Sequence, residues 1–155
     1  MRQVFCKDMD RSRAARAGTI ASVAYAMAMW ADLRILRYPF NDFTLLGRPF
    51  SRKRALWLPM GAAIHGLNGT VIGLVYGLVY PLLRGPGWLR GLIFAQAENL
   101  TLWPLMLVVD RFHPARREGQ LAAAWSRTGF LVGTLRHAAY GVVLGALYHP
   151  DARKG

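Results

Sequence analysis

The second half of this chain repeats a residue pattern from its first half. Four residues recur 72 positions later, so that His65, Gly69, Gly73 and Tyr76 return as His137, Gly141, Gly145 and Tyr148. The segments before these sets align one residue further apart, with Gly18, Ile20, Ala24 and Trp30 matching Gly91, Ile93, Ala97 and Trp103. A repeat of this length predicts one two-helix unit that was doubled, with the two copies packed together.

The composition indicates that both copies cross a membrane. Hydrophobic residues make up 54% of the 155 residues, although the chain also carries 20 Lys and Arg. A high hydrophobic content and many basic residues are compatible if the charges lie in loops and the apolar residues lie in membrane spans of about 20 residues each. Four such stretches occur, at about 17–36, 56–83, 88–109 and 129–148.

The predicted fold is therefore an all-α integral membrane four-helix bundle with 2+2 spans, forming a single domain over 1–155. Repeat 1 covers about 17–83 and repeat 2 about 88–150, after a basic N-terminal tail over 1–16. The Arg84-Gly85-Pro86-Gly87 segment predicts a tight turn. We expect this turn to make the second and third spans antiparallel neighbours.

A net charge of +12 raises the alternative of a soluble basic bundle that binds nucleic acid. The segment from Thr70 to Leu83 is apolar on every face and contains glycines, whereas soluble amphipathic helices keep a polar face. We therefore expect no nucleic-acid partner, and we expect the basic loops to meet anionic lipid headgroups of the bilayer. Lys and Arg tie at nine on each side of the predicted membrane, so the positive-inside rule favours neither orientation.

Glycines give the predicted spans faces for close helix packing. On a helix, residues at i, i+4, i+8 and i+11 share one face, so His65 and Tyr76 share a face with the glycines between them. Such a face lets another helix backbone approach closely. The expected packing positions are Gly61, Gly69, Gly73, Gly77, Gly133, Gly141 and Gly145.

The two repeated histidines allow a different interpretation of the same faces. Because the second and fourth spans run in the same direction, His65 and His137 are expected at equal depth. Two histidines at one depth are the ligands that hold a b-type haem in a helical bundle. They would also hold a metal ion with Glu98 as a third ligand. The packing interpretation requires neither group, and we favour it, because small-residue faces are the ordinary interface between membrane helices.

Polar residues inside the predicted spans mark a candidate intramembrane site. Glu98 lies well inside the third span, where a carboxylate is costly unless it is protonated, paired or hydrated. Polar residues at such depth are a default hypothesis for a functional site. The candidate set is His65, Asn68, Glu98, Asn99, Arg136 and His137.

Arg136 needs a partner if it lies within the fourth span. Asp32 and Asp110 end their spans on the same predicted membrane face as Arg136, where they would carry interfacial charge. We expect a salt bridge from Arg136 to Asp32, Asp110 or Glu98.

No catalytic signature accompanies this pattern. The sequence contains no G-x-S-x-G, Walker loop, H-E-x-x-H or C-x-x-C motif, and its single cysteine, Cys6, excludes an internal disulfide. We therefore predict no catalytic residue and expect a protein that is not an enzyme.

Two short motifs and the length of the chain point to a family. The Gly-x-Ile-Ala sequence from Gly18 to Ala21, a later His-x-x-x-Gly-x-x-x-Gly span and four spans in about 150 residues resemble the small bacterial inner-membrane proteins of the YagU-like group. The resemblance covers most of the chain. It implies a multi-pass protein of the inner (cytoplasmic) membrane, and it brings no catalytic residues with it.

Three functions follow as hypotheses. The first is an accessory or structural subunit of a membrane complex, or a homo-oligomer, which acts through its glycine faces. The second is a small transporter or channel whose polar path includes Glu98, His65 and His137. The third is an electron-transfer subunit whose haem is held by His65 and His137.

Overall fold

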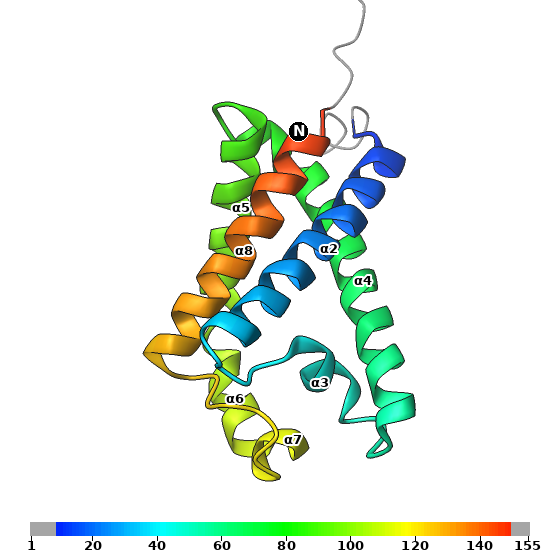
Figure 1. Ribbon diagram of the computed structural model, residues 1–155. Helices are drawn as coiled ribbons and strands as arrows, with labels where there is room; N and C mark the ends of the chain where they lie inside the picture. Colours follow the sequence, from blue (N-terminus) through cyan, green and yellow to red (C-terminus); the bar gives the residue numbers. More distant parts are fainter. Residues whose placement is uncertain (1–8, 150–155) are drawn as a thin grey trace, which may run out of the picture.

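The computed structural model describes residues 9–149, and all regular secondary structure in that range is helical (Figure 1). The elements are α2 (Arg11–Ile35), α3 (Asp42–Gly47), α4 (Arg54–Val79), the 3-10 helix η1 (Tyr80–Leu82), α5 (Gly87–Leu102), α6 (Leu105–Phe112), α7 (Pro114–Arg117) and α8 (Arg127–Leu147). The all-α prediction is confirmed over this range. Residues 1–8, which hold half of the predicted tail, and residue 150 of repeat 2 lie outside the described residues.

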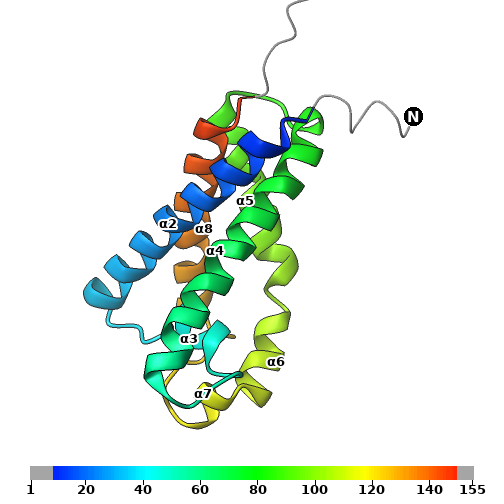
Figure 2. The ribbon, with the colours of Figure 1, turned by 90° about the vertical axis from the view of Figure 1, so that its right-hand side faces the viewer.

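The four long helices lie in the order α5, α8, α2, α4 across the molecule (Figure 1). Helix α2 packs against both α4 and α8, and α5 packs against α8. Helices α4 and α8 run in one direction, and α2 and α5 run in the other. The short α3 packs on α4, while α6 and α7 occupy the same end of the molecule as α3 (Figure 2).

The sequence predicts that α4 and α5 pack as antiparallel neighbours, and the structure does not show close packing between them. They follow each other along the chain through a short connection, but they are not among the closely packed helix pairs of residues 9–149. Tyr76 on α4 does meet Phe94 on α5, with ring centroids 5.2 Å apart. A turn restrains only the ends of two helices, and here each helix body packs on a different partner, α4 on α2 and α5 on α8.

Each of these two helix pairs is joined through glycines. A Cβ at Gly18 on α2 would lie 2.2 Å from the carbonyl oxygen of Gly69 on α4. A Cβ at Gly91 on α5 would lie 2.0 Å from the carbonyl oxygen of Gly141 on α8. Any side chain at these two positions would push the backbones apart, so the close approach requires glycine. The predicted packing faces of α4 and α8 are thus covered by helices of the same chain.

The two glycine contacts agree in register with the sequence repeat. Gly91 follows Gly18 by 73 residues and Gly141 follows Gly69 by 72, which are the offsets at which the two halves align. Beside these contacts, Ser22 of α2 packs on Gly69 and Ala95 of α5 packs on Gly141. A doubled two-helix unit would produce this correspondence. Duplication itself stays a hypothesis.

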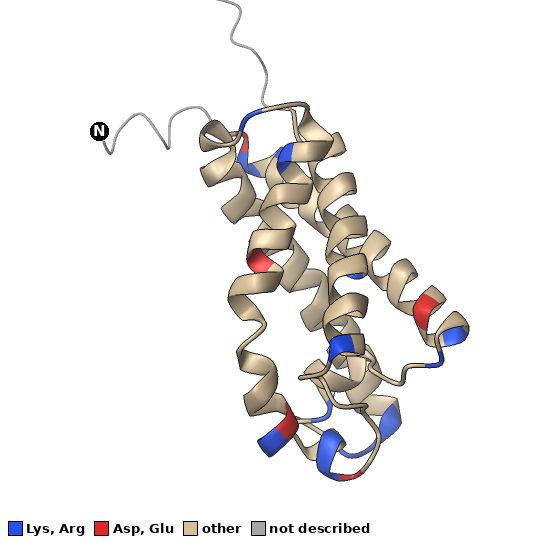
Figure 3. Ribbon diagram, turned by 90° about the vertical axis from the view of Figure 1, so that its left-hand side faces the viewer, with Lys and Arg blue, Asp and Glu red and all other residues tan. Residues whose placement is uncertain are grey.

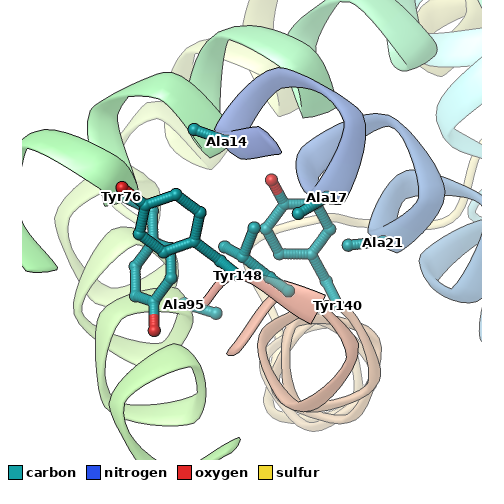
Figure 4. Close-up of a cluster of buried hydrophobic side chains, with 8 residues drawn as sticks. Ala14, Ala17, Ala21, Tyr76, Ala95, Tyr140 and Tyr148 are labelled. Carbon is teal, nitrogen blue, oxygen red and sulfur yellow. The ribbon is translucent and has the colours of Figure 1, made fainter. Parts of the chain in front are cut away.

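The core near the beginning of α2 combines small and aromatic side chains (Figure 4). Ala14, Ala17 and Ala21 of α2 are buried, and their small size leaves room for tyrosine rings from α4 and α8. The rings of Tyr76 and Tyr148 meet at 70° with their centroids 5.6 Å apart, which is a favourable edge-to-face geometry. This aromatic cluster closes the bundle at the end opposite α3.

Two helical stretches, Arg54–Leu82 and Arg127–Leu147, are long and apolar enough to cross a membrane. Helices α5 and α6 supply a third candidate if the pair is one span with a 50° bend. Pro104 precedes α6 and lacks the N–H that would continue the hydrogen bonding of α5, which explains the break. Helix α2 is not among the candidates. Length and composition therefore support two or three spans in the described residues.

The outer surface of the long helices carries many large apolar side chains. Large apolar side chains of α4 point outward, with Leu67 62% exposed. Helix α2 buries alanine, glycine and serine and exposes Val23, Met27 and Trp30. Lys, Arg, Asp and Glu gather mostly toward the two ends of the molecule (Figure 3). A soluble bundle has the opposite arrangement, with apolar side chains inside and charged side chains along its length.

Candidate functional site

Arg136 of α8 lies at the centre of a buried ion-pair cluster. It is 1% exposed and binds both oxygens of Asp32, with Nε donating to Oδ2 at 2.6 Å and Nη2 donating to Oδ1 at 2.7 Å. Its Nη1 donates to Oδ1 of Asp42 at 2.9 Å. Nη2 also donates to the carbonyl oxygen of Phe40 at 2.8 Å. The guanidinium therefore has charge-assisted hydrogen bonds on all three nitrogens.

The cluster ties together segments that are far apart in sequence. Asp32 lies in the last turns of α2, Phe40 lies in the segment after that helix, and Asp42 is the first residue of α3. Asn41 caps α3 by accepting hydrogen bonds from the N–H groups of Phe43 and Thr44, which holds Asp42 at the start of the helix. Arg136 thus connects the end of α2 and the start of α3 to the middle of α8.

Of the three carboxylates expected as partners for Arg136, Asp32 is the one that binds it. Asp110 instead accepts hydrogen bonds from Arg116 at 3.2 Å and from the backbone N–H groups of Ala124 and Trp125, both at 2.8 Å. It therefore stabilises the connection between α7 and α8.

Glu98 of α5 is the third carboxylate, and it lies near a histidine. Its Oε2 is 4.0 Å from Nε2 of His137, which is longer than a hydrogen bond. The Glu98 side chain is only 18% exposed. Within residues 9–149 the structure gives this carboxylate no hydrogen bond. A mostly buried carboxylate without a direct donor is costly in free energy.

The two repeated histidines meet the same aromatic ring. The ring centroids of His65 and His137 each lie 5.2 Å from that of Tyr25 on α2. The Nε2 of His65 donates to the carbonyl oxygen of Ser22 at 3.0 Å, and the Nδ1 of His137 donates to that of Gly133 at 2.8 Å. The two rings are thus held in different ways, one across to α2 and one within its own helix.

This geometry does not fit a haem held by two histidines. Two axial ligands would need to face one iron atom with the flat haem between them, but here both imidazole rings pack against the same side chain, Tyr25. The three-ligand metal site that included Glu98 is not assembled either. Among residues 9–149 no group of three or more His, Cys, Asp or Glu is placed to hold a metal ion.

A cavity of about 210 Å³ lies between α2, α4, α5 and α8, with α3 beside it. Four of the six candidate polar residues line it, namely His65, Asn68, Glu98 and His137. The remaining lining residues are Ser22, Tyr25, Asp42, Leu45, Leu46, Gly69, Ile72, Leu102 and Tyr140. The cavity is therefore a mostly apolar chamber with a few convergent polar groups, which is the usual character of a small-molecule site.

A second cavity of about 120 Å³ adjoins the first toward α6. Tyr25, Asp42 and His137 line both. The other two candidate residues, Asn99 and Arg136, line this second cavity. The polar set predicted from the sequence is therefore distributed over two adjoining chambers and not gathered in one cluster.

Asn99 turns away from its neighbour Glu98. It is buried, and its Nδ2 donates to Oγ1 of Thr134 on α8 at 3.3 Å. Its Oδ1 also faces Gly133, where an added Cβ would lie 3.3 Å away. Asn99 therefore contributes to the packing of α5 on α8.

The remaining predicted packing glycines lie at further contacts within the chain. A Cβ at Gly61 would lie 2.0 Å from the carbonyl oxygen of Phe43 in α3. A Cβ at Gly77 would meet the side chains of Met9 and Ala14. Gly61 therefore allows α3 to lie against α4, and this contact places α3 beside the cavity.

Three residues of the site were missed by the sequence reasoning: Tyr25, Asp42 and Tyr140. Tyr140 extends from α8 and donates from its hydroxyl to the carbonyl oxygen of Gly69 at 2.9 Å. A signal was present for Tyr25, because it precedes Glu98 by 73 residues and so occupies the position matching Glu98 in the first half. Asp42 gave no such signal, since it lies in the linker.

Comparison with known proteins identifies a family and no closer relative. Residues 9–153 match the family of unknown function DUF6789. No curated protein and no solved structure matches the chain. The resemblance to the YagU-like group stays a prediction. Because the match covers nearly the whole sequence, the chain belongs to the DUF6789 family.

Proposed function

We propose that this protein is a small membrane transporter or channel that binds its solute in the cavity between the four long helices. One observation carries the proposal: Glu98, mostly buried and without a hydrogen bond within residues 9–149, lines a cavity to which all four helices contribute. Polar side chains at membrane depth that face a cavity and not lipid mark solute and ion pathways.

We include α2 as a fourth span in this proposal. Its 25 residues would extend about 37 Å at 1.5 Å per residue, enough for the hydrocarbon core. Its four arginines lie near its two ends, and its remaining charged residue, Asp32, is neutralised inside the protein by Arg136 and adds little cost. Its low hydropathy follows from its position between α4 and α8, where small residues are needed. The 2+2 repeat, with α2 and α4 as one unit and α5 and α8 as the other, belongs to the same proposal.

The role of an accessory subunit or homo-oligomer has less support. It relied on glycine faces that would be open to partners, but Gly18, Gly69, Gly91 and Gly141 pack against each other within the chain. The apolar outer surface is accounted for by lipid. We retain the inner membrane as the proposed location, with basic ends that meet anionic headgroups.

The transport proposal is tested by electrical recording on proteoliposomes adsorbed to a solid support. Concentration jumps of protons, Na⁺, K⁺, methylammonium and tetramethylammonium are applied in turn. We expect at least one cation to give a current above that of protein-free liposomes, and Glu98→Gln to abolish it. Glu118→Gln is the matched control, because Glu118 is the only other glutamate in the chain and lies in the α7–α8 connection.

Two results would count against this function. If the wild-type protein gives no current above empty liposomes with any cation, the transport function is wrong. If Glu98→Gln carries the same current as wild type, the role of Glu98 is wrong.

A further inference from the structure

We propose that the cavity binds a small organic cation, such as a quaternary ammonium ion, which enters between α4 and α5 from the lipid. This inference rests on the proposed transport function and names the class of solute for the same cavity. Three features of the site carry it: the balance of charge, the chemistry of the walls and the position of the opening.

The charge around the two adjoining cavities is complementary to a cation. Glu98 and Asp42 line the first cavity, and Asp32 lies behind the second. Arg136 is the only Lys or Arg among the lining residues of either cavity, and it is shared by Asp32 and Asp42, which both bind it. Three carboxylates against one guanidinium leave two carboxylates in excess, so an added cation would improve the balance of charge.

The walls suit an organic cation better than a metal ion. Two tyrosine rings line the cavity, from Tyr25 and Tyr140. Aromatic ring faces attract ammonium and quaternary ammonium groups, and the attraction grows when the cation has lost its water. Leucine and isoleucine side chains supply the apolar part of the remaining wall, which also holds polar residues. A metal ion needs several ligands gathered around one point, and among residues 9–149 no group of three or more His, Cys, Asp or Glu is placed to hold one.

The opening of the cavity lies between α4 and α5. Asn68 on α4 and Leu102 on α5 line the cavity and are also exposed. These two helices are not closely packed, although α2 and α8, the pair that matches them in the proposed repeat, are. Leu67, next to Asn68 in sequence, and Leu100, two residues before Leu102, are also exposed and are apolar. A cation with apolar substituents would therefore reach Glu98 from the bilayer.

The test measures binding separately from transport. The protein is reconstituted in lipid nanodiscs and titrated with benzyltrimethylammonium by isothermal calorimetry, with empty nanodiscs as the background. Phenylmethanesulfonate, with a similar ring and the opposite charge, is the ligand control. We expect saturable binding of the cation at one site, no binding of the sulfonate, and at least tenfold weaker binding in Glu98→Gln. Glu118→Gln is expected to bind as wild type does.

A second variant keeps the test decisive if Glu98→Gln does not fold. Asn68→Trp adds bulk at the exposed mouth of the cavity and is expected to slow or prevent binding without disturbing the core. The inference is overturned if the cation binds no better than the sulfonate, or if folded Glu98→Gln and Asn68→Trp both bind as wild type does. Binding without any current would leave this site standing and remove the transport function. Currents without benzyltrimethylammonium binding would leave the transport function standing and overturn the organic-cation site.

Discussion

Arg136 of α8 binds both carboxylate oxygens of Asp32, which lies 104 residues earlier near the end of α2. The two residues belong to different predicted repeats, so this pair joins the halves of the molecule. It has no counterpart within the repeat, because the positions that match Arg136 and Asp32 are Ile64 and Leu105. The pair is therefore one source of the asymmetry by which α2 and α8 pack closely while α4 and α5 do not.

Breaking this pair is expected to destabilise the protein strongly. Asp32→Asn would leave the buried guanidinium with one carboxylate, Asp42, and should lower the free energy of unfolding by about 3 kcal/mol. The measurement is thermal unfolding in detergent micelles, followed by circular dichroism. Arg16→Gln, which alters an exposed arginine on the same helix, is the control. It should change the midpoint temperature of unfolding by less than about 2 °C. Equal midpoints for Asp32→Asn and wild type would contradict the assigned pair.

Substitution by alanine is expected to lower the free energy of unfolding at Gly91 and to leave it unchanged or raise it at Gly66. Gly91→Ala would place a Cβ 2.0 Å from the backbone of Gly141 and should destabilise the α5–α8 pair by about 1–3 kcal/mol. Gly66→Ala, on the α4 face where a Cβ meets nothing within 4 Å, should be neutral or stabilising by about 0.5–1 kcal/mol. The midpoints of unfolding should separate the two variants. Similar losses in both would show that α5 and α8 do not approach as closely as described.

The hydroxyl of Tyr140 offers a milder test of the contact between α8 and α4. Tyr140→Phe keeps the ring and removes the hydrogen bond to the carbonyl oxygen of Gly69, so we expect a loss of about 1 kcal/mol. Tyr76→Phe is a suitable control, since the Tyr76 hydroxyl is buried without a hydrogen-bond partner in the described residues and its removal should cost nothing. A larger loss for Tyr76→Phe than for Tyr140→Phe would reverse this assignment.

His113, at the junction of α6 and α7, should make stability depend on pH. Burial lowers the pKa of His113, and the positive charge of Arg48 lowers it further, while the hydrogen bond to Leu45 acts in the opposite direction. The Nε2 donates to the carbonyl oxygen of Leu45 at 2.8 Å, and the Nδ1 is buried without a partner in the described residues. The fold therefore favours the neutral ring.

The direction of this pH dependence follows from linkage. Because the pKa is lower in the folded than in the unfolded state, the unfolded chain binds more protons between the two values. The contribution to stability is fully present above the unfolded pKa of about 6.5 and is lost as the pH falls through the folded value. His113→Gln, whose amide still donates to Leu45 but does not titrate, should flatten the dependence of the unfolding midpoint below pH 6.5. An unchanged profile would assign the pH dependence to other groups.

Many of the helices were predictable because long apolar stretches and regularly spaced glycines can be recognised from neighbouring residues along the chain. The apolar stretches around Arg54–Leu82 and Arg127–Leu147 are helices of the expected kind, and the glycines at offsets of 72 and 73 do lie at helix contacts. Glycine faces indicate close packing whichever helix fills them. The sequence therefore indicated where backbones approach, but not which helix of the bundle fills each face.

The site was predictable in part. Glu98 and His137, both in the candidate set, come near each other, and Arg136 has one of its three expected partners. Asp42 was missed because its position depends on how the segment after α2 folds back over α8 to place α3. The spacing of apolar and polar residues along the sequence does not show where such a linker folds.

The sequence by itself determined the helices, the glycine faces and the presence of ionisable residues within apolar stretches, since each follows from neighbours along the chain. Only the tertiary structure decided that α5 packs on α8 and not on α4, that Arg136 binds Asp32, and that Glu98 lines a cavity to which all four long helices contribute. The physical reason is that the pairing and rotation of helices result from the sum of many contacts across the whole bundle. A connecting turn restrains only the ends of two helices.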